Sequence, residues 1–233
     1  MSEVPTVPEP VSSRRRVAAV FGLTLLEVIR SQDAPKEILA SEDPSVTMPR
    51  RLGLSDVVER QVRAYREEVR RGGRMSDEEV RDLVRLVIRR PDAEEVFFRA
   101  GRILAGDLDA GRGWRRIFPQ ALSYGFARRR AGRRLRSLFG RRVGGFASGG
   151  LFTLEARAHV LIQSDPGGDA CYFITGLCEA VVQCYGGRSC RIAHDKCQAR
   201  SDALCRWSVL AAERAGEAER VPDLLLRPEP GAG

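Results

Sequence analysis

The chain has 233 residues and an ordinary soluble composition, enough for one globular domain with or without a helical extension. The net charge of +8 suggests an acidic partner, but the excess is almost all arginine, which alone does not identify nucleic acid or a membrane. The apolar run from Val17 to Leu26 is too short to span a bilayer and no signal-peptide cleavage site follows it, so we expect a cytoplasmic protein without a transmembrane segment.

The two ends of the chain are rich in proline and in polar residues, and we expect neither to hold a fixed structure. The chain is predicted to have four parts: a disordered tail over 1–12, a helical region over 13–108, an α+β domain over 109–212 and a flexible tail over 213–233.

Helical spacing of apolar residues dominates the first half of the chain. Ser76 with Glu79 and Asp92 with Glu95 each match a capping box, in which each side chain accepts from the other residue's backbone N–H. Helices should therefore begin after Ser76 and after Asp92. Two more helices are predicted, one from Ser55 and one from about Trp114 to Phe139.

The second half changes to the alternation of a strand. Apolar and polar residues alternate from Phe152 to Gln163, which predicts a half-buried strand of about ten residues with His159 on its outward side. A turn at 165–168, a helix from about Asp169 to Gly186 and strands at 189–194 and 204–209 follow. This order predicts an α+β fold, with a helical N-terminal half followed by an antiparallel sheet with packed helices.

Three cysteines and a histidine near the C-terminus form the pattern Cys-x22-His-x2-Cys-x7-Cys, made by Cys171, His194, Cys197 and Cys205. Three thiolates and an imidazole suit tetrahedral zinc, and a site closed by four protein ligands is structural rather than catalytic. In a reducing cytoplasm cysteines also bind metal more often than they pair. The alternative is that the three cysteines are simply buried thiols.

The residues around this pattern resemble the 4-vinyl-reductase domain family, a zinc-containing small-molecule-binding module that shares its fold with transport-protein-particle subunits. The resemblance rests on Cys171-Tyr172-Phe173-x-x-Gly176, a glycine pair, His194-x2-Cys197 and Cys205-Arg206-Trp207. Its motif core covers about residues 150–211. His194 departs from the family, whose sensor members have an acidic ligand there, but imidazole is as good a zinc donor.

The resemblance implies an α+β domain, often a homodimer, in which structural zinc staples a hairpin beside an apolar cavity. Family members include sensor domains of transcriptional activators that respond to aromatic compounds, and a protein associated with bacteriochlorophyll vinyl reduction. In aromatic-sensing members a His and a Trp upstream of the first zinc cysteine hold the ligand. Here no Trp lies between Trp114 and Trp207, and His159 is expected to face outward, so we expect a more apolar ligand than a phenol.

The resemblance therefore implies a bacterial zinc-binding sensor or adaptor that binds a small hydrophobic ligand and signals through a homodimer or a regulatory protein partner. One alternative is an enzyme or enzyme accessory in tetrapyrrole vinyl reduction. Another is a protein–protein scaffold without a ligand, as in vesicle tethering. A non-enzymatic role is favoured, because the sequence has no nucleophile elbow and no dinucleotide fingerprint after a strand.

Two further sets of residues are candidates for binding. The aromatic side chains expected to line a ligand pocket, if they are not ordinary core, are Phe126, Phe139, Phe152, Phe173 and Trp207. An arginine run could bind an acidic partner, although a solvated helix face is the preferred interpretation and nucleic acid is not expected. The arginines of this patch are Arg128, Arg129, Arg130, Arg133, Arg134 and Arg136.

Overall fold

The computed structural model describes residues 15–33, 56–106, 120–140, 144–147, 151–157, 159–186 and 189–210. The tails predicted over 1–12 and 213–233 lie outside these residues. Within them the fold is α+β, as predicted, with a helical N-terminal half followed by a sheet and its packed helices. No helix of the described residues is both long enough and apolar enough to cross a membrane.

The helices and strands follow one another along the chain with short connections between most of them. The helices are α1 (Ala19–Asp33), α3 (Asp56–Arg70), α4 (Asp77–Val87), α5 (Ala93–Leu104), α6 (Gln120–Phe139), α7 (Val160–Ser164) and α8 (Tyr172–Gly186). The strands are β1 (Arg15–Ala18), β2 (Arg74–Ser76), β3 (Gly145–Phe146), β4 (Thr153–Ala156), β5 (Ile192–Lys196) and β6 (Cys205–Val209). Two short 3-10 helices, η2 (Asp169–Cys171) and η3 (Gln198–Arg200), flank the metal-ligand candidates.

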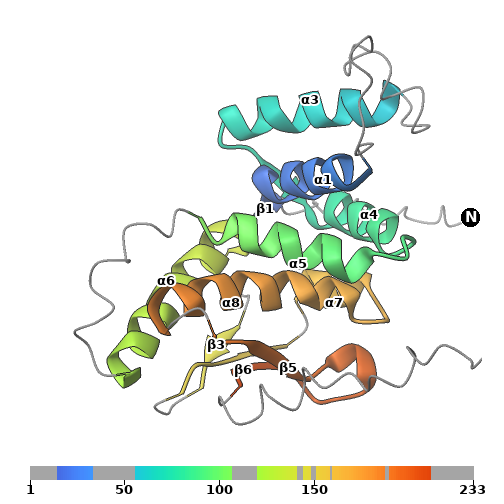
Figure 1. Ribbon diagram of the computed structural model, residues 1–233. Coiled ribbons are helices and arrows are strands. Elements are labelled where there is room, and N and C mark those ends of the chain that lie inside the picture. The colour runs from blue at the N-terminus through green and yellow to red at the C-terminus, as the bar shows by residue number, and fades with distance from the viewer. Residues whose placement is uncertain are drawn as a thin grey trace, which may run out of the picture.

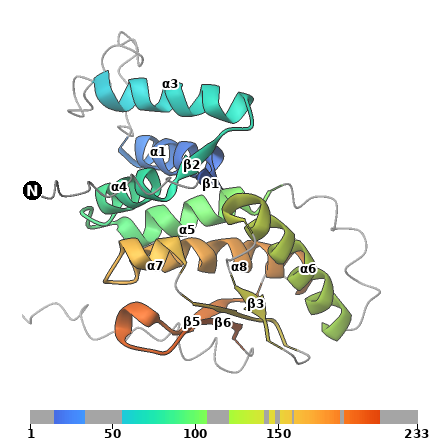
Figure 2. The ribbon, with the colours of Figure 1, turned by 180° about the vertical axis from the view of Figure 1, so that it is seen from behind.

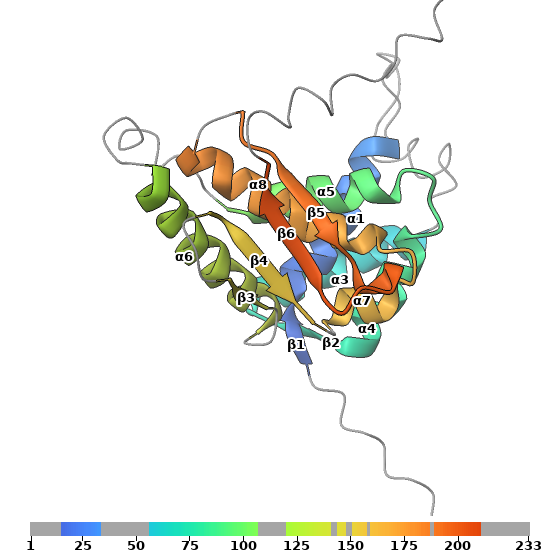
Figure 3. The ribbon, with the colours of Figure 1, turned by 90° about the horizontal axis from the view of Figure 1, so that it is seen from below.

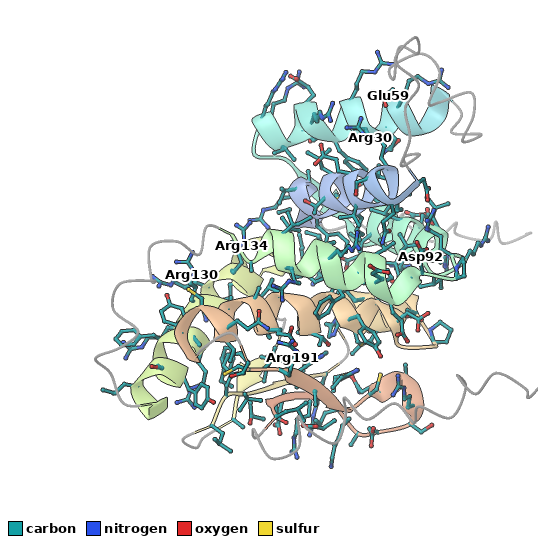
Figure 4. All side chains as sticks on the ribbon, viewed as in Figure 1. Arg30, Glu59, Asp92, Arg130, Arg134 and Arg191 are labelled. Carbon is teal, nitrogen blue, oxygen red and sulfur yellow. The ribbon has the colours of Figure 1, made fainter. Side chains whose placement is uncertain are left out.

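The molecule is built in layers, with helices stacked over one face of a four-stranded sheet (Figure 1). The strands of this sheet run antiparallel in the order β3-β4-β6-β5, and β1 pairs separately with β2. Seen from behind, α5 and α8 again lie between the sheet and the outer helices α1 and α3 (Figure 2). Ion pairing between Arg30 of α1 and Glu59 of α3, 3.7 Å apart, joins the two outermost helices (Figure 4).

The sheet has one covered and one open face. Viewed from below, no described helix lies in front of the strands (Figure 3). Side chains on the covered face, such as Leu154 and Trp207, are almost fully buried. On the opposite face Glu155 and Arg206 form an ion pair of 2.6 Å across β4 and β6. This alternation is what an antiparallel sheet with one solvated face requires.

Two glycines allow α5 and α8 to pack with their backbones in contact. A Cβ on Gly101 would fall on the carbonyl oxygen of Phe173, and a Cβ on Gly176 would fall on that of Phe98. Any larger residue at either position would push the helices apart. Helix α8, which carries the first candidate metal ligand on its N-terminal side, is therefore fixed against the helical half of the chain.

One hydrophobic core joins both halves of the chain. Phe21 of α1 contacts Phe139 of α6 and Phe173 of α8, with ring centroids 5.3 and 5.1 Å apart in edge-to-face geometry. Such aromatic pairs add to the stabilisation that their buried area provides. The region predicted as 13–108 thus contributes to the same core as the strands that follow it.

The helix starts predicted after Ser76 and Asp92 were right in position, but only one capping box forms; the start predicted at about Trp114 lies outside the described residues. Ser76 and Glu79 make both bonds of the box at the start of α4. The box predicted for Asp92 and Glu95 is wrong, because the Asp92 carboxylate accepts from the guanidinium of Arg90 at 2.8 and 3.0 Å and makes no cap bond to α5.

The strand predicted from Phe152 to Gln163 is wrong in its second half. Strand β4 ends at Ala156, and the chain then turns into the short helix α7. The alternation of apolar and polar residues continues past the end of the strand, but in α7 the buried residues are Leu161 and Ser164, whereas Val160 and Ile162 are half-buried. The predicted strand at 189–194 is shifted, since β5 spans Ile192–Lys196, whereas β6 matches its prediction closely.

Candidate metal centre

The four residues of the sequence pattern meet at one end of the β5–β6 hairpin, on the side of α7 (Figures 1 and 3). The Sγ atoms of Cys171, Cys197 and Cys205 and a ring nitrogen of His194 all lie within 4.8 Å of one another. All three cysteines are buried and His194 is half-buried. The four residues could therefore hold one metal ion.

Cys171 is placed by a turn that precedes α8. The Asp165 carboxylate accepts from the backbone N–H groups of Gly167 at 2.8 Å and of Ala170 at 2.6 Å, which closes the turn. Gly168 has a φ of +91°, a conformation that favours glycine, and its carbonyl accepts from the N–H of Cys171 at 3.1 Å.

Gly168 is also required by the cluster itself. A Cβ at this position would lie 2.9 Å from Sγ of Cys197. The turn before α8 and the turn after β5 therefore fit together only because Gly168 has no side chain. The sequence predicts the turn, but not the contact between Gly168 and Cys197.

A bulge in β5 brings His194 and Cys197 to the same side. His194 pairs with Trp207 and Lys196 with Arg206, so the register shifts by one residue between them. Without this shift, residues three apart in a strand would face opposite ways. Cys197 then begins the turn that contains η3.

The turn between β5 and β6 is closed by hydrogen bonds that orient the sulfur atoms. The Asp202 carboxylate accepts from the N–H of Cys197 at 2.8 Å, and the Asp202 N–H donates to the Cys197 carbonyl at 3.2 Å. The N–H of Gln198 donates to Sγ of Cys205 at 3.3 Å. A backbone donor aimed at sulfur stabilises a thiolate, which is the form that binds metal.

His194 is held by packing, and its two ring nitrogens have no hydrogen-bond partner. Its ring stacks on Trp207 at a centroid distance of 4.7 Å and an angle of 6°. Trp207 donates from Nε1 to Thr175 Oγ1 at 3.1 Å, and Thr175 donates to the Cys171 carbonyl at 3.3 Å. A buried ring nitrogen without a partner is costly, and a metal ion bound to it would remove that cost.

The pKa values of the three thiols in the cluster are shifted in different directions. A hydrogen bond from the Cys171 thiol lowers the pKa of Cys205 to about 4, and the same bond, with burial, raises the pKa of Cys171. Burial raises the pKa of Cys197. Cys205 is thus the first of the three to become a thiolate. A metal ion would favour the thiolate form of all three.

His159 is not exposed, and the prediction that it faces outward is wrong. Because β4 ends before it, His159 precedes α7 and is buried to 6% exposure, with Nε2 lacking a partner. Its ring centroid lies 6.2 Å from that of Trp207. Burial lowers the pKa of His159 to about 3, so the imidazole is neutral.

The aromatic residues predicted to line a ligand pocket make separate ring contacts in the described part of the chain. Phe139 and Phe173 pack against each other with centroids 5.6 Å apart. Phe152 contacts Phe146, and Trp207 supports His194. Phe126 lies apart from these, on α6, and is 43% exposed.

The six arginines of the predicted basic patch all lie on α6 and differ in their exposure. Arg129, Arg133 and Arg136 are exposed, and the other three are half-buried. Arg134 is used within the fold, since its Nε donates to the carbonyl of Leu104 at the end of α5 (Figure 4).

Comparisons with known proteins give no relative for this chain. No protein-family model matches it, and neither the curated proteins nor the solved structures contain a match.

Proposed function

We propose that Cys171, His194, Cys197 and Cys205 bind a structural zinc ion in a small-molecule sensor or adaptor domain. The observation that carries this proposal is the convergence of the four ligand atoms to within 4.8 Å from η2, β5, β6 and the β5–β6 connection. Tetrahedral zinc with Zn–S bonds of about 2.3 Å requires ligand atoms about 3.8 Å apart. The ligands would have to close in by only about 1 Å to meet this requirement.

Zinc would join the hairpin to the helix layer. Cys171 precedes α8, whereas the other three ligands belong to β5, β6 and their connection. With four protein ligands no coordination position is left for water or substrate, which favours a structural role over catalysis. A ring nitrogen of His194 without a hydrogen-bond partner is available to an ion, and the backbone donor on Cys205 favours the thiolate that binds metal.

The resemblance to 4-vinyl-reductase domains supports the sensor or adaptor role. In that role the protein acts in the bacterial cytoplasm as a homodimer or with a regulatory protein partner, and a small hydrophobic ligand changes that surface. A ligand-free scaffold is the second candidate, favoured by one observation. Four of the five aromatic residues considered for a pocket are packed into the core instead: Phe139, Phe152, Phe173 and Trp207.

The metal content of two variants tests the proposal. Native mass spectrometry of protein purified without chelator should find one zinc per chain in the parent and none in Cys197→Ser. Cys190→Ser is the matched control, because Cys190 is a half-buried thiol outside the cluster and this variant should keep its zinc. A parent protein without zinc would contradict the metal site.

The same spectra separate the two candidate functions. Additional mass that accompanies the zinc-bound chain would identify a bound small molecule and support the sensor. A zinc-bound chain with no other bound mass would favour the scaffold.

A further inference from the structure

A groove lies along α6 where this helix faces β3. Its volume is about 450 Å³, a size that suits a small molecule rather than a single ion. The groove lies on the face of α6 that turns away from the buried side of the helix. It is lined by Leu122, Gly125, Phe126, Arg128, Arg129, Arg136, Phe146 and Ala147.

One part of the groove is apolar although it is open to solvent. Leu122 and Phe126 are 52% and 43% exposed, among the most exposed large hydrophobic residues of the described chain. The Phe126 ring is supported by Tyr185, on which it stacks at a centroid distance of 6.4 Å. Phe146 lies on the opposite side and is anchored by Phe152. An exposed aromatic patch held in place in this way is typical of a binding surface.

The other part of the groove is cationic. Arg128, Arg129 and Arg136 line it, and no carboxylate is among its described lining residues. At Gly132, an added Cβ would meet the Phe146 ring at 3.1 Å and Nη1 of Arg136 at 3.7 Å. The guanidinium of Arg136 and the Phe146 ring therefore both lie next to Gly132, which carries no side chain.

We propose that this groove binds a small amphipathic carboxylate, with its aromatic or branched body on Phe126 and Phe146 and its anionic group on Arg129 and Arg136. A planar guanidinium pairs with a carboxylate through two parallel hydrogen bonds, which a neutral ligand cannot match. The role of such a ligand as a signal rests on the proposed sensor function. Binding itself does not depend on the metal centre.

Naphthoate is a suitable probe, because it combines an aromatic body with a carboxylate. Titration calorimetry with the full chain should show binding of naphthoate, and about tenfold weaker binding of the neutral naphthamide. Equal binding of the two would overturn the proposal, since the arginines would then contribute nothing.

Two arginines on the same helix provide a matched pair of variants. Arg129→Gln, within the groove, should weaken naphthoate binding about tenfold, while Arg133→Gln, also exposed but outside it, should change binding by less than about twofold. Similar losses in both variants would indicate nonspecific attraction to a basic helix and would overturn the proposal.

Gly125 allows the groove to be filled without disturbing the fold. A Cβ on Gly125 meets no atom within 4 Å, so Gly125→Trp should place an indole in the groove and abolish naphthoate binding. Naphthoate binding that survives in a folded Gly125→Trp protein would overturn the proposal. The arginine pair decides the question if this variant fails to fold.

Other occupants give different results in the same experiments. If the groove is a contact between two copies, the parent will not bind naphthoate and Gly125→Trp will convert a dimer to a monomer in analytical ultracentrifugation. If it serves an anionic membrane, the parent will bind phosphatidylglycerol vesicles but not naphthoate. Either result overturns the proposal.

The zinc content of each sample keeps this test independent of the metal centre. Protein with one zinc per chain that does not bind naphthoate contradicts the groove alone. Protein without zinc that binds naphthoate contradicts the metal centre alone.

Discussion

Substitution of Gly168 by alanine should weaken both the fold and the metal centre, for two separable reasons. The φ of +91° is strained for any residue with a Cβ, at a cost of about 1–2 kcal/mol. The new methyl group would also lie 2.9 Å from Sγ of Cys197, where ordinary contact needs at least 3.4 Å. The sulfur must therefore move by about 0.5 Å, more than the roughly 0.2 Å tolerance of metal–ligand distances.

We expect Gly168→Ala to lower zinc affinity about 10- to 100-fold, as loss of a supporting contact around a metal site commonly does. Its free energy of unfolding with zinc should fall by about 2–5 kcal/mol, the sum of backbone strain and weaker metal binding. Zinc affinity can be measured by competition with a chromophoric chelator, and stability by urea denaturation with and without zinc.

Gly140 provides the control for backbone strain. Its φ is +79°, but a Cβ there would meet nothing within 4 Å. Gly140→Ala should cost about 1 kcal/mol of stability and leave zinc affinity unchanged. If Gly168→Ala binds zinc within about twofold of the parent, the reasoning that places Cys197 against this glycine is refuted.

Three further predictions concern the surroundings of the site. Thr175→Val removes the acceptor of the buried Trp207 Nε1 and should cost about 1–3 kcal/mol in urea denaturation; a cost below about 0.5 kcal/mol would argue against that bond. Gly176→Ala places a methyl on the Phe98 carbonyl and should cost about 3 kcal/mol or more, whereas Gly125→Ala, with open space, should add about 0.5–1 kcal/mol of stability. Thermal melts of the Gly176→Ala and Gly125→Ala variants test this prediction. Equal changes in melting temperature would contradict the close approach of α5 and α8. The pKa of His159 is about 3 in the folded state, below its value of about 6.5 in the unfolded state. As the pH falls below about 6.5, the unfolded state therefore gains a proton first. The free energy of unfolding should then fall by up to about 1.4 kcal/mol per pH unit. This slope should be smaller in His159→Gln when unfolding is measured between about pH 6.5 and pH 5, and an unchanged slope would show that His159 is not buried neutral.

Local sequence patterns predicted the start of a helix well where a capping residue precedes regularly spaced apolar residues. Helices α4 and α5 begin where Ser76 and Asp92 indicated, because polar residues that can cap a helix precede regularly spaced apolar ones. Whether the cap bonds form is a different matter. Asp92 could cap α5, but Arg90, which also pairs with Asp33 of α1 at 2.7 Å, holds its carboxylate instead. Arg90 lies only two residues from Asp92, but its contact with Asp33, which is far away in the chain, is not visible in local sequence.

The sequence by itself determined the α+β class and the four candidate metal ligands, because residue type and spacing along the chain are enough to specify both. Only the tertiary structure decided the burial of His159, since the alternating pattern runs on to Ile162 although β4 ends at Ala156 and the short helix α7 follows. It also decided how Phe126 and Arg136 share one groove, and why Gly168 must be glycine. These features depend on contacts between segments far apart in the chain, and hydrophobic periodicity carries no information about such contacts.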